Sequence, residues 1–268
     1  MRWFWRKEAD KSTGSAIPGQ ENDDHRRKAF DDVIHMTNSL LLGTTRLVER
    51  AAVYDFVIWS LGQQIAADGN VLFVSGKDTP ENREYDLSTL FPGINVSSEG
   101  VQEFDLSKIP TYTGPWDRNR FPNAIQSIFT HGFRHEMAYN KGILYKELNF
   151  AVMLNGRHHT SWGIFAGECI QPMEVISLEP YFPYVKTDGA YLIYTDSHRS
   201  RVLHKLIDSR LAAMYRLAQM KWEAGYPNEH TALLSEHYRQ SQEADFWREQ
   251  AETKDKRIKE LEQLLSSK

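Results

Sequence analysis

The sequence is poor in cysteine, since Cys169 is the only one among its 268 residues. A single cysteine cannot form a disulfide within the chain, and this composition fits a reducing compartment. We therefore expect a cytoplasmic protein. We interpret Cys169 as a small buried hydrophobe rather than a nucleophile.

Long hydrophobic runs and an excess of basic residues are also lacking. No stretch reaches the roughly 18 consecutive apolar residues that a membrane helix needs. The formal net charge of −4 argues against broad, non-specific nucleic-acid binding, which requires a basic face, although a local basic patch stays compatible with it. We expect no membrane partner.

Residues 1–7 (MRWFWRK) are aromatic and basic, and no apolar run follows them. They are too short for a signal peptide, so we interpret them as a loose or docked tail, with a membrane-touching anchor as the alternative. Residues 8–25 are polar and include Gly, Pro and Ser. Such a segment cannot bury enough surface to fold alone, and we expect residues 1–25 to be a flexible N-terminal segment.

Residues 26–100 are predicted to form a helical extension with one strand and a long connection. Apolar residues recur at helical spacing from Arg26 and again from Thr45 to Ala67. Asp68-Gly69 is a typical helix stop, and residues 70–75 (NVLFVS) resemble a buried strand. The following Ser-Gly-Lys-Asp lacks the upstream glycine and the final Ser or Thr of a phosphate loop, so we interpret it as a turn.

Residues 101–195 are predicted to form the core of an α+β fold with a small mixed sheet. We expect a strand near 103–109, an arginine-bearing loop, and a helix over 122–130 that ends at Gly132. A strand over 148–154 precedes a helix over 158–166, and further strands follow at 173–178 and 190–195.

The last part, residues 196–268, is predicted to be a helical arm. One amphipathic helix starts near Val202 and ends around residues 225–227. Apolar positions in 228–268 follow an alternating 4/3 spacing with a polar middle. Two interpretations stay open for this segment: a short coiled coil that makes a homo-oligomer, or a single helix packed on its own domain.

The turn after the strand at 148–154 is the most promising site for chemistry. Glycine lets the backbone turn tightly, and a helix that starts there presents unpaired N–H groups and the positive end of its dipole to an anion. Arginine can fork onto phosphate, and histidine can donate hydrogen bonds or move protons near neutral pH. A plain helix cap on a polar surface is the competing interpretation. The residues concerned are Asn155, Gly156, Arg157, His158, His159, Thr160 and Ser161.

The order of these elements resembles the ParB/sulfiredoxin-like superfamily over residues 101–178. The carrying sequences are Asp105-Leu-Ser-Lys-Ile109, the loop with Arg118 and Arg120, Ser127-Ile-Phe-Thr-His-Gly132, and Asn155-Gly-Arg-His-His159. The resemblance implies that the glycine turn grips nucleotide phosphates. An uncharacterised bacterial or mobile-element family is the wider group that the chain resembles.

The resemblance also implies roles for single residues. Gly156 matches the glycine of the turn, and His158 and His159 occupy the positions of its basic residues. Sulfiredoxin chemistry needs a cysteine where this chain has Arg157, so we do not expect that activity. Together with the helix-start pattern, the resemblance gives the expected ligand-binding set of Arg118, Arg120, Gly132, Arg134, His135, Asn155, Gly156, Arg157 and Ser161.

Two classes of function follow. The first is binding of a nucleotide (ATP or CTP) or DNA, with Mg²⁺ accompanying the nucleotide, and NTP hydrolysis or nuclease activity through His158, His159 and Glu168. The second is a non-catalytic interaction or nucleotide-sensing module. A metal site built from His131, His135, Glu136, His158 and His159 is a further alternative, but the spacing is not that of a known metal motif, and we expect none.

Overall fold

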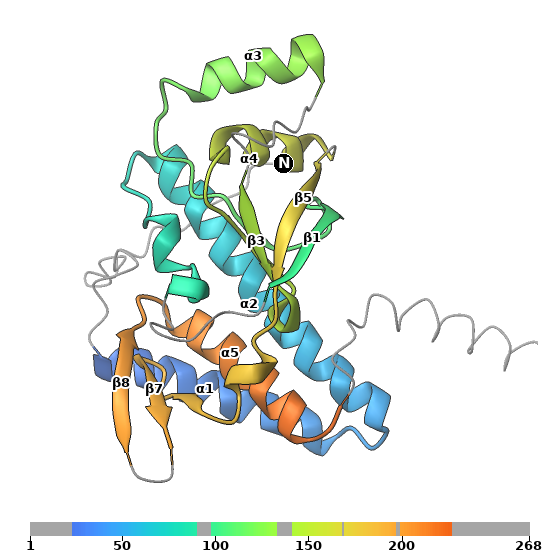
Figure 1. Ribbon diagram of the computed structural model, residues 1–268, viewed down its shortest axis with the longest axis vertical. Coiled ribbons are helices and arrows are strands. Elements are labelled where there is room, and N and C mark those ends of the chain that lie inside the picture. The colour runs from blue at the N-terminus through green and yellow to red at the C-terminus, as the bar shows by residue number, and fades with distance from the viewer. Residues whose placement is uncertain (1–22, 90–97, 133–140, 168, 197–198, 227–268) are drawn as a thin grey trace, which may run out of the picture. The chain divides into compact units, whose positions relative to one another are not determined.

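Helices and two separate sheets make up the described part of the chain, which confirms the predicted α+β class (Figure 1). The computed structural model describes residues 23–89, 98–132, 141–167, 169–196 and 199–226. All of them belong to one compact unit that ends at Tyr226. The expected coiled coil over 228–268, the tail over 1–22, Arg134, His135, Glu136 and Glu168 lie outside the described residues.

The helices are α1 (Asp23–Leu42), α2 (Leu47–Ser75), α3 (Phe121–His131), α4 (Arg157–Ala166) and α5 (Ser209–Glu223). The strands are β1 (Ser98–Asp105), β2 (Thr111–Tyr112), β3 (Gly142–Tyr145), β4 (Phe150–Met153), β5 (Ile170–Ile176), β6 (Val185–Thr187), β7 (Tyr191–Thr195) and β8 (Ser200–Lys205). The 3-10 helices are η1 (Asn82–Glu84), η2 (Leu87–Thr89), η3 (Lys146–Leu148) and η4 (Glu179–Tyr181).

The larger sheet is mixed and has the strand order β1-β5-β3-β4-β2. β3 and β4 form an antiparallel hairpin, while β3 runs parallel to β5 and β2 runs parallel to β4. β1 pairs antiparallel with β5 at the edge. The smaller sheet is an antiparallel meander in the order β6-β7-β8.

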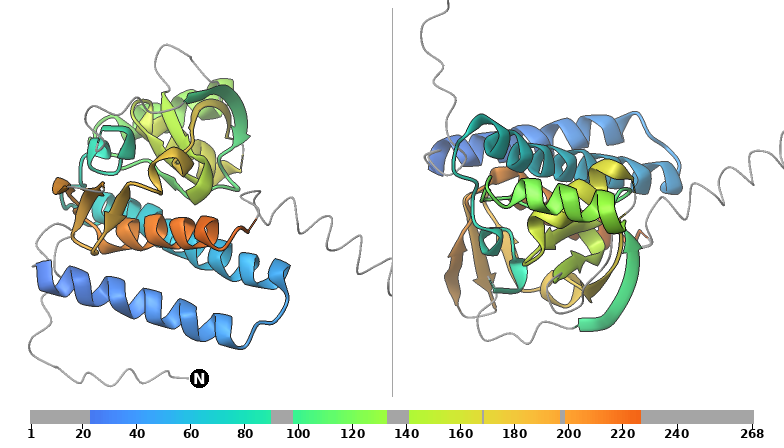
Figure 2. Two further views of the ribbon diagram at one scale, coloured as in Figure 1. Left: turned by 60° about the horizontal axis from the view of Figure 1, so that its bottom comes forward. Right: turned by 90° about the horizontal axis from the view of Figure 1, so that it is seen from above.

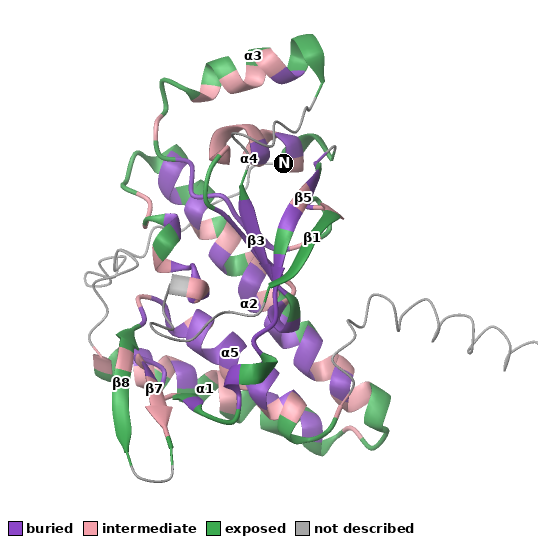
Figure 3. Cartoon of the chain, viewed as in Figure 1, coloured by how far each residue is buried: buried purple, intermediate pink, exposed green. Residues whose placement is uncertain are grey.

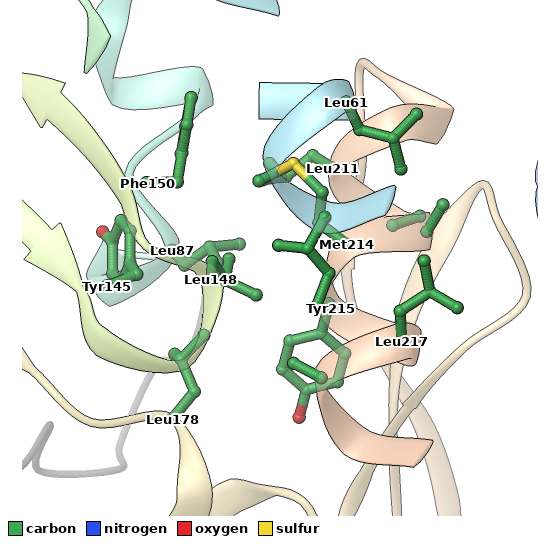
Figure 4. Close-up of a cluster of buried hydrophobic side chains, with 14 of the residues drawn as sticks. Leu61, Leu87, Tyr145, Leu148, Phe150, Leu178, Leu211, Met214, Tyr215 and Leu217 are labelled. Atoms are coloured by element: carbon green, nitrogen blue, oxygen red, sulfur yellow. The ribbon is translucent and has the colours of Figure 1, made fainter. Parts of the chain in front are cut away.

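Alternate side chains of the larger sheet enter two different cores. In β4, Phe150 and Val152 point to the main core, whereas Ala151 and Met153 point to a second cluster with Cys169. This period of two is what a strand buried on both faces requires. Figure 4 shows Phe150 and its neighbours facing Leu61 of α2 and Met214 of α5 across the main core.

Helices from the two ends of the described sequence share one layer. α5 packs against both α1 and α2, and Figure 2 shows the three side by side. A buried ion pair at 2.7 Å joins Lys221 of α5 to Asp55 of α2. On the other face of the sheet, Ile164 of α4 packs against the second cluster. Figure 1 shows α4 and α1 at opposite ends of the described fold.

The strand predicted over residues 70–75 is wrong, because α2 continues as a helix to Ser75. Gly69 does not stop it: a Cβ there would lie 2.8 Å from the Tyr112 ring, so glycine serves close packing inside the helix. The helix ends at Gly76, whose φ of 86° is left-handed, which confirms the turn expected at that point.

The helix predicted from Val202 is also wrong at its start. Residues 200–205 form β8, which pairs with β7 across a turn in which the Asp196 carboxylate accepts the Arg199 N–H at 2.8 Å. The hairpin thus crosses the boundary expected at residue 195. The helix α5 begins only after Asp208, whose side chain accepts the Arg210 N–H as its N-cap.

The predicted helices over 122–130 and 158–166 correspond to α3 and α4, and the predicted strands near 103–109, 148–154, 173–178 and 190–195 correspond to β1, β4, β5 and β7. The strands β2, β3 and β6 were not anticipated. Among the described residues, none of the helices combines the length and apolarity that a bilayer crossing requires.

Candidate functional site

The turn between β4 and α4 has the geometry expected of a glycine-led helix start. Gly156 adopts φ 73° and ψ 18°, a left-handed conformation that favours glycine, and its N–H donates to the Asn155 side chain at 2.9 Å. The first main-chain bond of α4 runs from the Thr160 N–H to the Gly156 carbonyl at 2.9 Å. The amides of Arg157 and His158 precede that bond, and in the described chain no side chain caps the helix.

A cavity of about 530 Å³ lies at this helix start. Its walls come from the turn itself, from α3 and from the loop that precedes α3. Figure 1 shows α3 above α4 at that end of the fold, and the two helices are in contact. The lining residues are Trp116, Arg120, Ala124, Ser127, Leu154, Asn155, Gly156, Arg157, His158 and His159.

His158 acts as an acceptor for the preceding loop. Its Nε2 accepts a hydrogen bond from the main-chain N–H of Asp117 at 3.0 Å. Its ring also lies 6.0 Å from that of Trp116. Burial, together with the positive charge of Arg157, lowers the pKa of His158, and both effects favour the neutral ring that can accept a proton.

Arg157 is engaged in holding two loops together. One of its terminal nitrogens, Nη1, donates to the Asn82 side chain at 2.6 Å and to the Gly114 carbonyl at 3.0 Å. Asn82 is buried and donates in turn to the carbonyls of Thr113 and Met153. Burial lowers the pKa of Arg157. The Arg157 guanidinium therefore lines the cavity, and its hydrogen bonds to Asn82 and Gly114 leave it less available to bind phosphate.

Trp116 and Arg120 form the opposite rim. The indole of Trp116 is 54% exposed, and the Arg120 guanidinium lies 5.1 Å from its ring centre. Arg120 pairs with Asp117 at 3.3 Å, but its side chain is 67% exposed, which leaves it able to reach an anion in the cavity. A second hollow, of about 430 Å³, shares Trp116, Leu154 and Arg157 with the first.

Three predicted ligand-binding residues lie away from the cavity. Arg118 donates to the Phe73 carbonyl at 3.0 Å and covers Gly76 at the end of α2. Gly132 ends α3 with φ 71° on an exposed surface. Ser161 sits one turn into α4, where its hydroxyl donates to Thr113 at 2.6 Å on the side facing the sheet. Each has a structural role in its own element.

The structure brings together the predicted residues Arg120, Asn155, Gly156, Arg157, His158 and His159. It adds Ala124, Ser127 and Leu154, which the sequence interpretation missed. Ala124 and Ser127 are three apart on α3, so helical spacing placed them on one face, but nothing in the sequence indicated that this face meets α4.

Cys169 is fully buried, as predicted, and burial raises the pKa of its thiol to about 12. It is therefore not a nucleophile at neutral pH. The described residues contain no group of three His, Cys, Asp or Glu side chains that could hold a metal ion.

The chain belongs to a family of unknown function, DUF6710, whose family model matches residues 15–228. The match spans every described residue and stops close to Tyr226, where the compact unit ends. Comparison with curated proteins and with solved structures found no match.

Proposed function

We propose that this member of DUF6710 binds a phosphate group, carried by a nucleotide or a nucleic acid, in the cavity at the start of α4. One observation carries the proposal: a cavity of about 530 Å³ coincides with an uncapped helix start. The amides of Arg157 and His158 have no acceptor among the described residues, and a phosphate oxygen would supply one.

The charges around the cavity support an anionic ligand. The positive end of the α4 dipole and the exposed guanidinium of Arg120 both favour negative charge there. Trp116 offers an exposed ring beside them, on which a base can stack. Two carboxylates lie near the cavity, and both are paired with arginines: Asp117 with Arg120, and Glu81 of the second hollow with Arg83.

We also propose that residues 101–178 are of the ParB/sulfiredoxin-like kind. In support, β1 is followed by the short strand β2, by the arginine loop, by α3 ending at Gly132, by the hairpin β3–β4, by the Gly156 turn with α4, and by β5. The element order agrees with the resemblance. It supports a relationship at fold level and assigns no reaction.

Mg²⁺ would arrive with the nucleotide in this proposal. The described residues do not gather the three ligand side chains of a protein-held metal, whereas Mg²⁺ on a nucleotide is held mainly by phosphate oxygens and water. The chain would hold the phosphate and orient it. The ion would neutralise part of the phosphate charge.

Binding without turnover is favoured over hydrolysis by the geometry of His158 and Asp117. The Nε2 of His158 already accepts a hydrogen bond, and the Asp117 carboxylate is paired, so neither is placed to take a proton from water. His159 is the remaining described candidate for a base in the cavity. A nucleotide-sensing module is thus the form of the function we propose, with NTP hydrolysis or nuclease activity as the second candidate.

Calorimetric titration with ATP, CTP, GTP and a short DNA duplex, each with and without Mg²⁺, tests the proposal. We expect one ligand to saturate a single site and Arg120→Ala to weaken it about tenfold by removing a charge-assisted contact. Arg46→Ala is the matched control, because Arg46 is 62% exposed and also makes an i,i+3 ion pair, far along the chain at the start of α2.

No heat with any ligand would overturn the proposal, as would equal losses in Arg120→Ala and Arg46→Ala. A binding isotherm without release of inorganic phosphate would support the sensing module. Phosphate release that stops in His159→Ala would instead support the hydrolase.

A further inference from the structure

An aromatic surface extends from the cavity along α3 and α4. It consists of rings in contact at centre-to-centre distances of 4.9 to 6.3 Å, and it forks at Trp162. We call this set the aromatic row, and its members are Trp116, His158, Phe121, Trp162, Phe129 and Phe165. It begins at the rim of the cavity and ends at Phe129 of α3 and at Phe165 of α4.

The outer rings of this row are unusually exposed. Phe129 is 77% exposed and Phe165 is 75% exposed, although each contacts Trp162. Figure 3 shows α3 exposed or half-buried along most of its length. Among the helices, α3 makes its main packing contact with α4 alone. Large exposed apolar surface of this kind marks a binding surface.

The charge of this region differs from that of the whole chain. Residues 118–132 and 154–167, which carry the two helices, contain no aspartate or glutamate, and the neighbouring Asp117 is paired with Arg120 at 3.3 Å. They contain three arginines and three histidines, in a chain whose formal net charge is −4. A surface that is aromatic and free of carboxylates within these stretches complements a polyanion that also has flat apolar faces.

A single-stranded nucleic acid has both properties. Its bases expose their faces for stacking on aromatic side chains, and its phosphates are drawn to arginines and helix starts. A duplex hides those faces. The ring steps exceed the about 3.4 Å per nucleotide of one B-DNA strand, so the row suits a strand whose bases are separated.

We propose that α3 and α4 bind single-stranded nucleic acid, with one phosphate in the cavity and the following bases stacked along the aromatic row. This inference rests on the proposed function, because the cavity anchors the strand. It adds the class of ligand, a polymer rather than a free nucleotide, and the path that the polymer follows.

Fluorescence anisotropy with a labelled oligothymidylate of about 12 nucleotides tests this path. We expect the oligonucleotide to bind more tightly than thymidine monophosphate and its affinity to fall as salt rises. Phe129→Ala and Phe165→Ala should each weaken the oligonucleotide about tenfold or more, since one stacked base is lost. The affinity for the mononucleotide should not change.

Phe56→Ala is the matched control, because Phe56 is 63% exposed on α2 and lies outside the aromatic row. Thermal unfolding of each variant checks that the fold is kept. An oligonucleotide that binds no more tightly than the mononucleotide, or that is indifferent to both row variants, overturns this inference and leaves the phosphate site standing.

Failure of both ligands also overturns this inference, and it overturns the phosphate site only if ATP, CTP, GTP and the DNA duplex fail to bind as well. Analytical sedimentation of the same variants tests whether the aromatic row binds a second copy of the protein instead. If wild type self-associates through Phe129 and Phe165 and binds no oligonucleotide, the aromatic row is a protein interface and the inference is wrong.

Discussion

The Nε2 of His158 accepts a hydrogen bond from the main-chain N–H of Asp117 at 3.0 Å. Because an amide can only donate, this nitrogen must carry a lone pair, which places the ring proton on Nδ1 and makes the side chain neutral. A residue expected from the sequence to bind phosphate or transfer protons thus positions the loop that carries Trp116 and Arg120.

Replacing His158 should therefore loosen that loop. We expect His158→Ala to weaken the phosphate ligand about tenfold and to lower the thermal midpoint slightly, because one hydrogen bond worth roughly 1 kcal/mol is lost. His158→Asn, whose side-chain oxygen can accept the Asp117 N–H, should retain more affinity. Titration calorimetry and thermal unfolding measure both effects, with His35→Ala on the exposed side of α1 as the control. An Asn variant as weak as the Ala variant would argue against the positioning role.

The lowered pKa of His158 gives a pH dependence with a definite sign. Burial and the Arg157 charge lower it, Asp117 raises it, and Arg120 lowers it further. Below the ordinary histidine pKa of 6.5, the unfolded chain then binds a proton that the folded chain does not. The free energy of unfolding should therefore fall as the pH drops below 6.5. The contribution of neutral His158 to that free energy should be fully present above this pH.

Urea unfolding of wild type and His158→Asn at about pH 7.5 and about pH 5.5 measures this contribution. His204, whose pKa burial also lowers, titrates with the same sign in both proteins and cancels in the comparison. The wild type should lose more stability on acidification than the variant. Equal losses would mean that His158 titrates alike in the folded and unfolded chains.

Arg157 should matter for stability as well as binding. Its removal leaves the Asn82 side-chain oxygen and the Gly114 carbonyl without their donor, at a cost of about 1.5–3 kcal/mol. We expect Arg157→Ala to lower the thermal midpoint by several degrees. Arg83→Ala, at a side chain that is 75% exposed, should leave it unchanged. A midpoint unaffected by Arg157→Ala would show that the bridge is dispensable.

The ion pair between Lys221 and Asp55 should be strongly coupled. Both side chains are at most 5% exposed, and their atoms lie 2.7 Å apart. Lys221→Met should lower the free energy of unfolding by about 3–5 kcal/mol, because it leaves a buried carboxylate without its cation. Adding Asp55→Leu should recover most of the loss. Urea unfolding of the single and double variants gives the coupling, and additive losses would contradict it.

The fold was predictable where one local signal dominated. Strands with period-two burial such as β4, and the helices α3 and α4 closed by glycine, follow from patterns within about ten residues. The end of α2 was not predictable, because Gly69 is required by its close contact with the Tyr112 ring and not by a helix stop. Tyr112 is distant in sequence, so the local pattern does not show this contact. Likewise, β8 is fixed by pairing with β7, and its sequence alone fits a helix.

The candidate site was predictable in its centre and not in its surroundings. The Gly156 turn and α4 are contiguous in sequence, so their geometry followed from local rules. The partners of His158 and Arg157 come from residues 41 to 75 positions away along the chain. The spacing of residues in the sequence does not reveal partners that far away. His158 and Arg157 were therefore expected to face a ligand and not each to hold a neighbouring loop.

The most direct test of the phosphate site is an NMR titration of the ¹⁵N-labelled protein with the best-binding nucleotide, following the amide resonances of Arg157 and His158. These are the two donors that the account assigns to phosphate at the start of α4. We predict that both shift saturably and with one dissociation constant, together with the indole resonance of Trp116. Saturable binding that leaves these amides unmoved, or shifts confined to another part of the chain, would contradict the account.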